Sequence, residues 1–194
     1  MTKNRLEAFS DGVFAIIITI MVLALKIPTG AEFSSLLPVV PVFFSYILSF
    51  LFLGIYWNNH HHMLHTVKHV TGGILWSNLH LLFWLSLFPF VTGWMGENYL
   101  SPATLALYGI VLFCAAAAYF ILQRVIIKSQ GKESLLARAV GSDIKGKSSP
   151  LLYIAGITIS FISPLIAGFI YLTVAVIWLV PDRRIERIIK AEKL

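Results

Sequence analysis

The stretch RLEAFSDGVFAIIITIMVLALKIP, residues 5–28, decides the class of fold. It combines charged side chains with an almost unbroken apolar run. Between Asp11 and Lys26 there are about 14 uncharged residues, or roughly 21 Å of α-helix, whereas the apolar core of a bilayer is about 30 Å thick. A helix that crosses a membrane here must therefore draw Phe9, Ser10 and Asp11 toward the apolar layer.

The charged residues of this helix are candidate functional residues. An ionisable side chain at that depth is costly and normally faces a bundle interior or a water-filled cavity. Arg5 and Asp11 are six positions apart, which does not suit a pair on one face of a helix. We therefore expect each of them to meet its partner on another helix.

The composition is that of an integral membrane protein. Of the 194 residues, 58% are hydrophobic and 12% are charged, and the mean hydropathy is +0.82. A soluble domain carries about 25% charged residues. The lone cysteine, Cys114, excludes an intramolecular disulfide and a thiolate metal cluster. The net charge of +6 is read as a signal of membrane topology and not of nucleic-acid binding.

Long segments without Asp, Glu, Lys or Arg predict the membrane spans. The last of them, residues 148–181, is too long for one helix and too short for two full spans. Basic residues flank it on both sides, so it is expected to cross an even number of times, as a hairpin that turns at Ser163–Pro164. The predicted fold is an all-α, six-helix transmembrane bundle with spans 5–27, 36–58, 73–95, 102–123, 149–163 and 166–181.

The distribution of Lys and Arg predicts the orientation of this bundle. In the six-span arrangement every Lys and Arg except Lys26 falls on the side of the two termini. The positive-inside rule then makes both termini cytoplasmic in a multi-pass protein of the cell membrane. The basic tail, residues 182–194, has Ile185, Ile188 and Ile189 on one helical face, which is typical of an interfacial helix or of a basic continuation of the last span.

Several short motifs carry a family resemblance. They occur in chain order over roughly the first 95 residues: Arg5, Phe9-Ser10-Asp11 with the following GVFAIIIT, Tyr56-Trp57, His60-His61, Asn78-Leu79 and Phe88-Pro89-Phe90. With them the chain resembles the lysosomal potassium-channel family, transmembrane protein 175, in its single-repeat prokaryotic branch. The second half matches that family only in hydropathy and helix count.

The resemblance implies a pore lined by the first helix. Ile16, Thr19, Ile20 and Leu23 form one helical stripe, which by itself is typical of ordinary packing. In the family, bulky apolar side chains at the positions of Ile16, Ile20 and Leu23 narrow the pore, and Thr19 adds a hydroxyl. The resemblance also implies a homotetramer whose four first helices surround a potassium path.

The same residues suggest a polar network between helices. We expect Arg5, Ser10 and Asp11, in the block that also holds Phe9, to meet polar residues of the second and third helices. The candidates on those helices are Trp57, His60 or His61, and Asn78. Such a network either supports the bundle or takes part directly in ion passage or gating.

A histidine cluster offers a rival site. His60, His61, His62, His65 and His69 crowd the end of the second helix, and two histidines one turn apart can bind a transition metal. No Cys, Asp or Glu lies nearby in sequence. We therefore expect no metal site and no cofactor.

The resemblance thus implies a potassium-selective channel that is not an enzyme. No TVGYG-like carbonyl filter occurs in the sequence, so a pore like that of the family is expected to use an apolar constriction as filter and gate. Its expected partners are other copies of the chain, membrane lipids and potassium ions, and no nucleic acid. The alternative is a secondary transporter for protons or metal ions that uses Asp11 and the histidines. A membrane enzyme is a third possibility, which the lack of a nucleophile–base pair disfavours.

Overall fold

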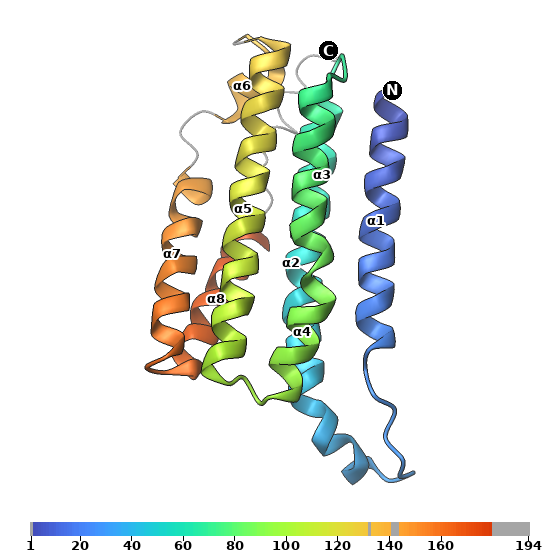
Figure 1. The fold of residues 1–194 in the computed structure, drawn as a ribbon, viewed down its shortest axis with the longest axis vertical. Coiled ribbons are helices and arrows are strands. Elements are labelled where there is room, and N and C mark those ends of the chain that lie inside the picture. The colour runs from blue at the N-terminus through green and yellow to red at the C-terminus, as the bar shows by residue number, and fades with distance from the viewer. Residues whose placement is uncertain (1, 132, 141–143, 180–194) are drawn as a thin grey trace.

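The protein is an elongated bundle of helices (Figure 1). The computed structural model describes residues 2–131, 133–140 and 144–179. Every regular element within these ranges is a helix. The predicted all-α fold is therefore confirmed, while the predicted basic tail, residues 182–194, lies outside the described residues.

Helix α1, Lys3–Leu23, lies at the edge of the bundle (Figure 1). Its buried residues follow one stripe at steps of three and four, as an amphipathic helix requires: Leu6, Ser10, Phe14, Ile17 and Met21. This stripe packs against α2, α3 and α4. The rest of the α1 surface is left without a neighbour from the described part of the chain.

Helix α2, Val40–His65, is entered through the 3-10 helix η1, Phe33–Val39. Pro38 lies inside η1, and Pro41 lies in the first turn of α2, where a missing N–H costs nothing. The helix continues seven residues beyond the predicted span 36–58. The histidines at its end are therefore helical, up to and including His65.

The third predicted span, 73–95, is divided into α3, Gly72–Ser86, and α4, Phe88–Glu97. The interruption falls at Leu87, two residues before Pro89. Proline has no N–H for the helical ladder, and its ring clashes with the carbonyl four residues earlier, so the helix breaks and restarts there. The two pieces follow each other in nearly the same direction (Figure 1).

The second half of the chain contains α5, Pro102–Gln130, the short α6, Leu135–Val140, and a hairpin of two helices. The hairpin consists of α7, Ile144–Ser160, and α8, Pro164–Leu179. Its turn ends where Pro164 opens α8, and the N–H groups of Ile162 and Ser163 donate to the carbonyl of Ile159. This is the position that the Ser163–Pro164 pair predicts.

Tyr171 of α8 fastens the hairpin to α5. Its ring lies against Gly109 of α5 and Gly156 of α7, where an added Cβ would collide with it. The Tyr171 hydroxyl donates to the carbonyl of Leu105 at 3.2 Å. The two glycines therefore allow three helix backbones to approach one aromatic ring.

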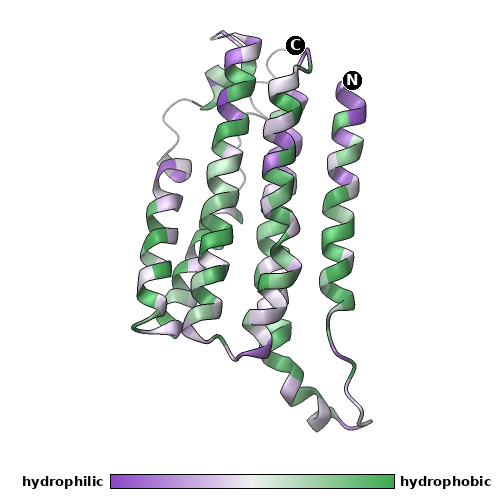
Figure 2. Ribbon diagram, in the orientation of Figure 1, coloured by the Kyte–Doolittle hydropathy of each residue, from purple (hydrophilic) through white to green (hydrophobic). Residues whose placement is uncertain are grey.

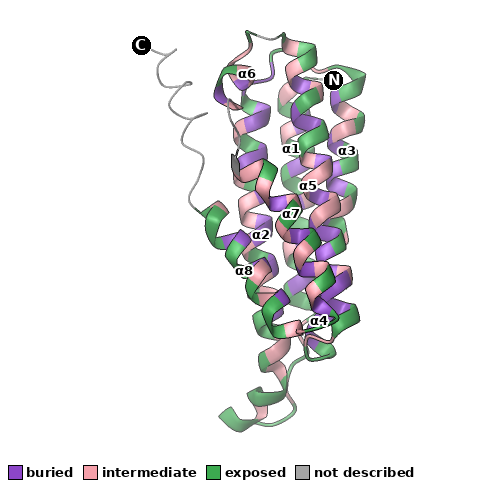
Figure 3. Ribbon diagram, turned by 90° about the vertical axis from the view of Figure 1, so that its left-hand side faces the viewer, coloured by how far each residue is buried: buried purple, intermediate pink, exposed green. Residues whose placement is uncertain are grey.

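The helices are those of a membrane protein. Four helical segments are long and apolar enough to cross a bilayer: Lys3–Leu23, Phe33–His65, Gly72–Glu97 and Pro102–Gln130. At 1.5 Å per residue, α7 and α8 are each roughly 25 Å long, slightly less than the apolar core of a bilayer. Apolar residues dominate the middle of the bundle in Figure 2, and exposed residues lie on its outer faces in Figure 3.

Charge is distributed unevenly along the bundle. The described Lys and Arg residues other than Lys26 lie toward the end that holds the N-terminus, which we call the basic end: Lys3, Arg5, Lys68, Arg124, Lys128, Arg138, Lys145 and Lys147. Lys26 lies at the other end and pairs with Glu97 at 2.8 Å.

Candidate functional site: the first helix and its polar contacts

A buried chain of hydrogen bonds links α1 to its two neighbours. The Asn78 side chain of α3 donates to the Ser10 hydroxyl at 3.0 Å, and its carbonyl oxygen lies 2.7 Å from Nε2 of His60 on α2. Ser10 in turn donates to the carbonyl of Leu6 at 2.9 Å. Ser10, His60 and Asn78 are all buried. Because the Asn78 carbonyl oxygen can only accept, Nε2 of His60 carries a proton.

A second polar contact lies closer to the surface. The Trp57 indole N–H donates to a carboxylate oxygen of Asp11 at 3.0 Å. The Trp57 ring is stacked on that of His61, with 6.3 Å between centroids, and His61 is stacked on His65 at 6.2 Å. Asp11 and Trp57 are both exposed in the single chain.

The residues predicted to form one network therefore fall into two groups. Ser10, His60 and Asn78 form the buried group, and Asp11, Trp57 and His61 form the group at the surface. Phe9 and Arg5 are exposed. Within the described ranges, the Arg5 guanidinium has no hydrogen bond or ion pair with its own chain.

The predicted pore stripe lies on the outward side of α1. Ile16 is 59% exposed, Ile20 49% and Leu23 76%, whereas Ile17 and Met21 on the opposite side are buried. The exposed Thr19 hydroxyl donates to the carbonyl of Ala15 at 2.8 Å and keeps its oxygen lone pairs available. This side of α1 can therefore meet another copy of the chain or lipid.

The histidine cluster is dispersed around α2. His60 points into the core, against the ring of Phe14 at 5.7 Å, while His61 and His65 are exposed. Among the residues that the structure describes, no group of three or more His, Cys, Asp or Glu side chains is placed to bind a metal ion.

A further buried polar cluster was missed in the sequence. The Ser49 hydroxyl of α2 lies 2.7 Å from Thr92 of α4 and 3.0 Å from the Tyr108 hydroxyl of α5. The Thr92 hydroxyl lies 3.8 Å from the sulfur of Met21 on α1. Each of these hydroxyl residues stands alone within an apolar segment, as is common in transmembrane helices. The sequence therefore gave no signal that they lie together.

Known proteins resemble this chain over most of its length. The profile of the family described as endosomal/lysosomal potassium channel TMEM175 matches residues 5–89. A potassium channel of Chryseobacterium sp. (strain P1-3) is 56% identical over 191 residues, which cover 98% of this chain and 99% of that protein. A potassium channel of Chamaesiphon minutus (strain ATCC 27169 / PCC 6605) is 30% identical over 172 residues, which cover 82% and 85%.

A solved structure has the same fold. The crystal structure of a lysosomal potassium-selective channel TMEM175 homolog from Chamaesiphon minutus gives a TM-score of 0.79 at 26% identity, over 93% of this chain and 97% of that one.

Fold and site together define a helical membrane protein. Its first helix packs against the bundle on one side only and makes polar contacts with α2 and α3 through Asp11 and Ser10. The chain belongs to the family of the endosomal/lysosomal potassium channel TMEM175. The resemblance seen in the first 95 residues is thus confirmed. The match to the Chryseobacterium relative extends it to nearly the whole chain.

Proposed function

We propose that this chain is the subunit of a potassium-selective channel. Membership of the family supports this function, since relatives named potassium channel match it along most of its length. The proposed channel needs no cofactor and performs no enzymatic reaction. Potassium ions are its permeant species.

The proposed pore forms between subunits. The observation that carries this proposal is the uncovered apolar stripe of α1, in which Ile16, Ile20 and Leu23 are about half exposed or more. Apolar surface on a helix that already packs on its other side suits contact with further copies of the same helix. We infer a homotetramer in which four α1 helices surround the axis.

The apolar side chains of the four α1 helices would form a ring around the axis. This ring would be a constriction that selects among ions and opens or closes the pore. Methyl groups offer an ion nothing in place of its hydration water, and a narrow apolar neck can also close by dewetting. Potassium is more weakly hydrated than sodium and would pass at lower cost. Thr19 would contribute hydroxyl oxygens beside the neck.

We assign a supporting role to the polar groups around α1. The contacts of Ser10 and Asp11 join α1 to α2 and α3 and would hold the pore helix at a fixed rotation. The chain would lie in the cell membrane with six spans and with both termini in the cytoplasm. A cysteine at Ile162, in the turn between α7 and α8, should then react with an impermeant reagent only from outside.

Planar-bilayer recording tests the proposed pore. Ile16→Asn should raise the total cation current and lower the preference for potassium over sodium, because a polar ring replaces part of the hydration shell. Ile166→Asn on α8 is the matched control, since Ile166 is 52% exposed but lies far from α1. It should leave the reversal potential unchanged.

Two outcomes would contradict the proposal. Unchanged selectivity in well-assembled Ile16, Ile20 and Leu23 variants would exclude a pore lined by α1. Saturable, pH-coupled flux without unitary current steps would instead favour a carrier that uses Asp11 and the histidines.

A further inference from the structure

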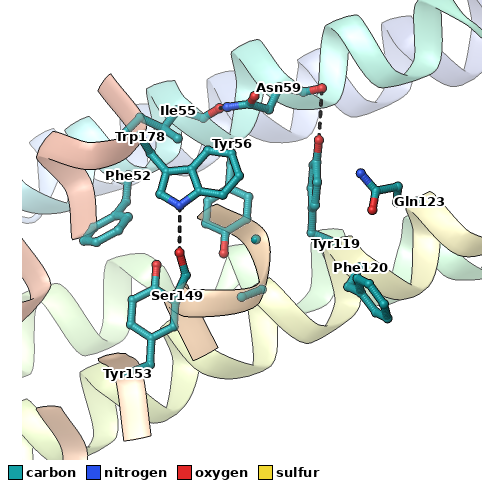
Figure 4. Close-up of a pocket in the computed structure, with 12 residues that line it drawn as sticks. Phe52, Ile55, Tyr56, Asn59, Tyr119, Phe120, Gln123, Ser149, Tyr153 and Trp178 are labelled. Atoms are coloured by element: carbon teal, nitrogen blue, oxygen red, sulfur yellow. Dashed lines mark hydrogen bonds between the residues drawn. The ribbon is translucent and has the colours of Figure 1, made fainter. Parts of the chain in front are cut away.

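A hollow with a volume of about 60 Å³ lies inside each subunit, away from the α1 stripe. Its walls come from α2, α5 and the ends of α7 and α8 (Figure 4). Half of the residues that line it are aromatic, including Phe52, Tyr56, Tyr119, Tyr153 and Trp178. The space is far smaller than the roughly 300 Å³ that a drug-sized ligand needs, so it can hold only a small polar group.

Three polar side chains that line this hollow make no hydrogen bond within the described part of the chain. Tyr56 is 9% exposed, Gln123 6% and Tyr153 3%. Their polar atoms are not fully enclosed, so these groups remain accessible to a small molecule that enters the hollow. Two phenol O–H groups and one amide NH₂ are thus available as donors to an acceptor in the hollow.

The other polar groups at the hollow are already paired. The Trp178 indole N–H donates to the Ser149 hydroxyl at 2.8 Å, and Tyr119 donates to the carbonyl of Asn59 at 3.4 Å (Figure 4). Ser149 donates to the carbonyl of Lys145, also at 2.8 Å. These bonds fix the wall and leave Tyr56, Gln123 and Tyr153 for a ligand.

Basic side chains flank the hollow. The Arg124 guanidinium lies 4.8 Å from the ring centroid of Phe120, which lines the hollow. Lys145 Nζ donates to the carbonyl of Ile177, next to Trp178. Lys147 is exposed and directly follows Gly146, which lines the hollow. The lining itself contains no Asp or Glu. The surroundings therefore favour an anion.

The depth of the hollow in the membrane suits a lipid. From Pro102 to Arg124, α5 rises roughly 33 Å, close to the thickness of the apolar core of a bilayer. If α5 begins at one face of that core, Arg124 lies at the headgroup level of the other. Gln123 and the hollow lie just below it, at the level of the glycerol esters.

We propose that the hollow receives the ester region of an anionic glycerophospholipid whose phosphate lies between Arg124 and Lys147. The ester carbonyls accept hydrogen bonds from Tyr56, Tyr153 and Gln123, while the acyl chains follow the exposed apolar helix surfaces. Basic pockets between transmembrane helices are known to suit anionic headgroups. The lipid joins the α7–α8 hairpin to α2 and α5.

Native mass spectrometry of the full-length protein in detergent tests this site. With added phosphatidylglycerol, the wild type should retain one lipid per subunit, and it should retain phosphatidylcholine more weakly. Tyr153→Phe removes only the hydroxyl and should lower phosphatidylglycerol retention about fivefold, the effect of one hydrogen bond of about 1 kcal/mol. Gln123→Leu and Arg124→Gln should each lower it as well.

Lys68→Gln is the matched control, because Lys68 lies at the basic end beside Gln130, whereas Arg124 lies over Phe120 of the lining. It should leave retention unchanged. Equal retention of the two lipids by the wild type would overturn the proposal. An equal loss in Lys68→Gln and Arg124→Gln would also overturn it, since it would indicate attraction to overall charge. If Gln123→Leu does not fold, Tyr153→Phe still decides the matter.

Discussion

At the scale of single residues, the buried contact between Ser10 and Asn78 explains why a serine is needed inside an apolar helix. Its hydroxyl donates within α1 and accepts from α3, so both capacities of the oxygen are used. The Asn78 amide would be left unpaired without it. Ser10 thus aligns α1 with α3 and, through Asn78, with His60 of α2.

Ser10→Ala should therefore lower the free energy of unfolding by about 1 kcal/mol, because the Asn78 amide loses a partner in a buried site. Ser77→Ala is a matched control, since the Ser77 hydroxyl also bonds to the carbonyl four residues earlier but is exposed. Thermal unfolding in detergent, followed by tryptophan fluorescence, measures both. Equal losses in the two variants would show that the contact between helices contributes nothing.

At the scale of elements, the α7–α8 hairpin is held by a close fit around Tyr171. Glycine in a helix normally costs about 1 kcal/mol relative to alanine, so glycine at positions 109 and 156 needs a steric reason. The contact of both residues with the Tyr171 ring supplies it. The hairpin is shorter than a full span and depends on this fit to stay packed on α5.

Gly156→Ala should destabilise the protein by about 1–3 kcal/mol, because the added methyl group collides with a fully buried ring. Gly168→Ala, in α8, should instead be neutral or slightly stabilising, since nothing lies within 4 Å of its added Cβ. We expect the melting temperature to fall in Gly156→Ala and to stay the same or rise slightly in Gly168→Ala, relative to the wild type. A similar small gain in both would mean that Tyr171 moves aside at little cost.

At the scale of the whole molecule, the single chain leaves one helix half covered. Helix α1 packs on one side only, and its free side carries apolar residues at the position where the proposed tetramer has its axis. In that tetramer, side chains at the axis would come from different subunits and would lie close together. The hairpin turn, by contrast, lies across the subunit from α1 (Figure 1).

Leu23→Cys in a Cys114→Ala background should form disulfides between subunits on mild oxidation, because cysteines near a common axis can reach the roughly 5.5 Å Cα separation that a disulfide requires. Ile162→Cys is the control, as it is 85% exposed but far from α1. Non-reducing electrophoresis measures the dimer yield. Equal yields for both cysteines would place α1 away from any shared axis.

The sequence by itself determined the class of protein, the family, the position of most helices and the hairpin turn at Ser163–Pro164. These features depend on local signals, namely hydropathy, charge flanks, proline and motif spacing, which act along the chain. It also identified the polar residues around α1. Because signals along the chain carry no information about contacts between helices, it did not separate these residues into a buried group and a surface group.

Only the tertiary structure decided how those residues pair: Ser10 with Asn78 and His60, and Asp11 with Trp57. It also decided the fit of Tyr171 between two glycines and the unpaired groups of Tyr56, Gln123 and Tyr153. Pairing across helices depends on the rotation and relative depth of each helix. Those two variables are set by packing over the whole bundle, and no single stretch of sequence contains them.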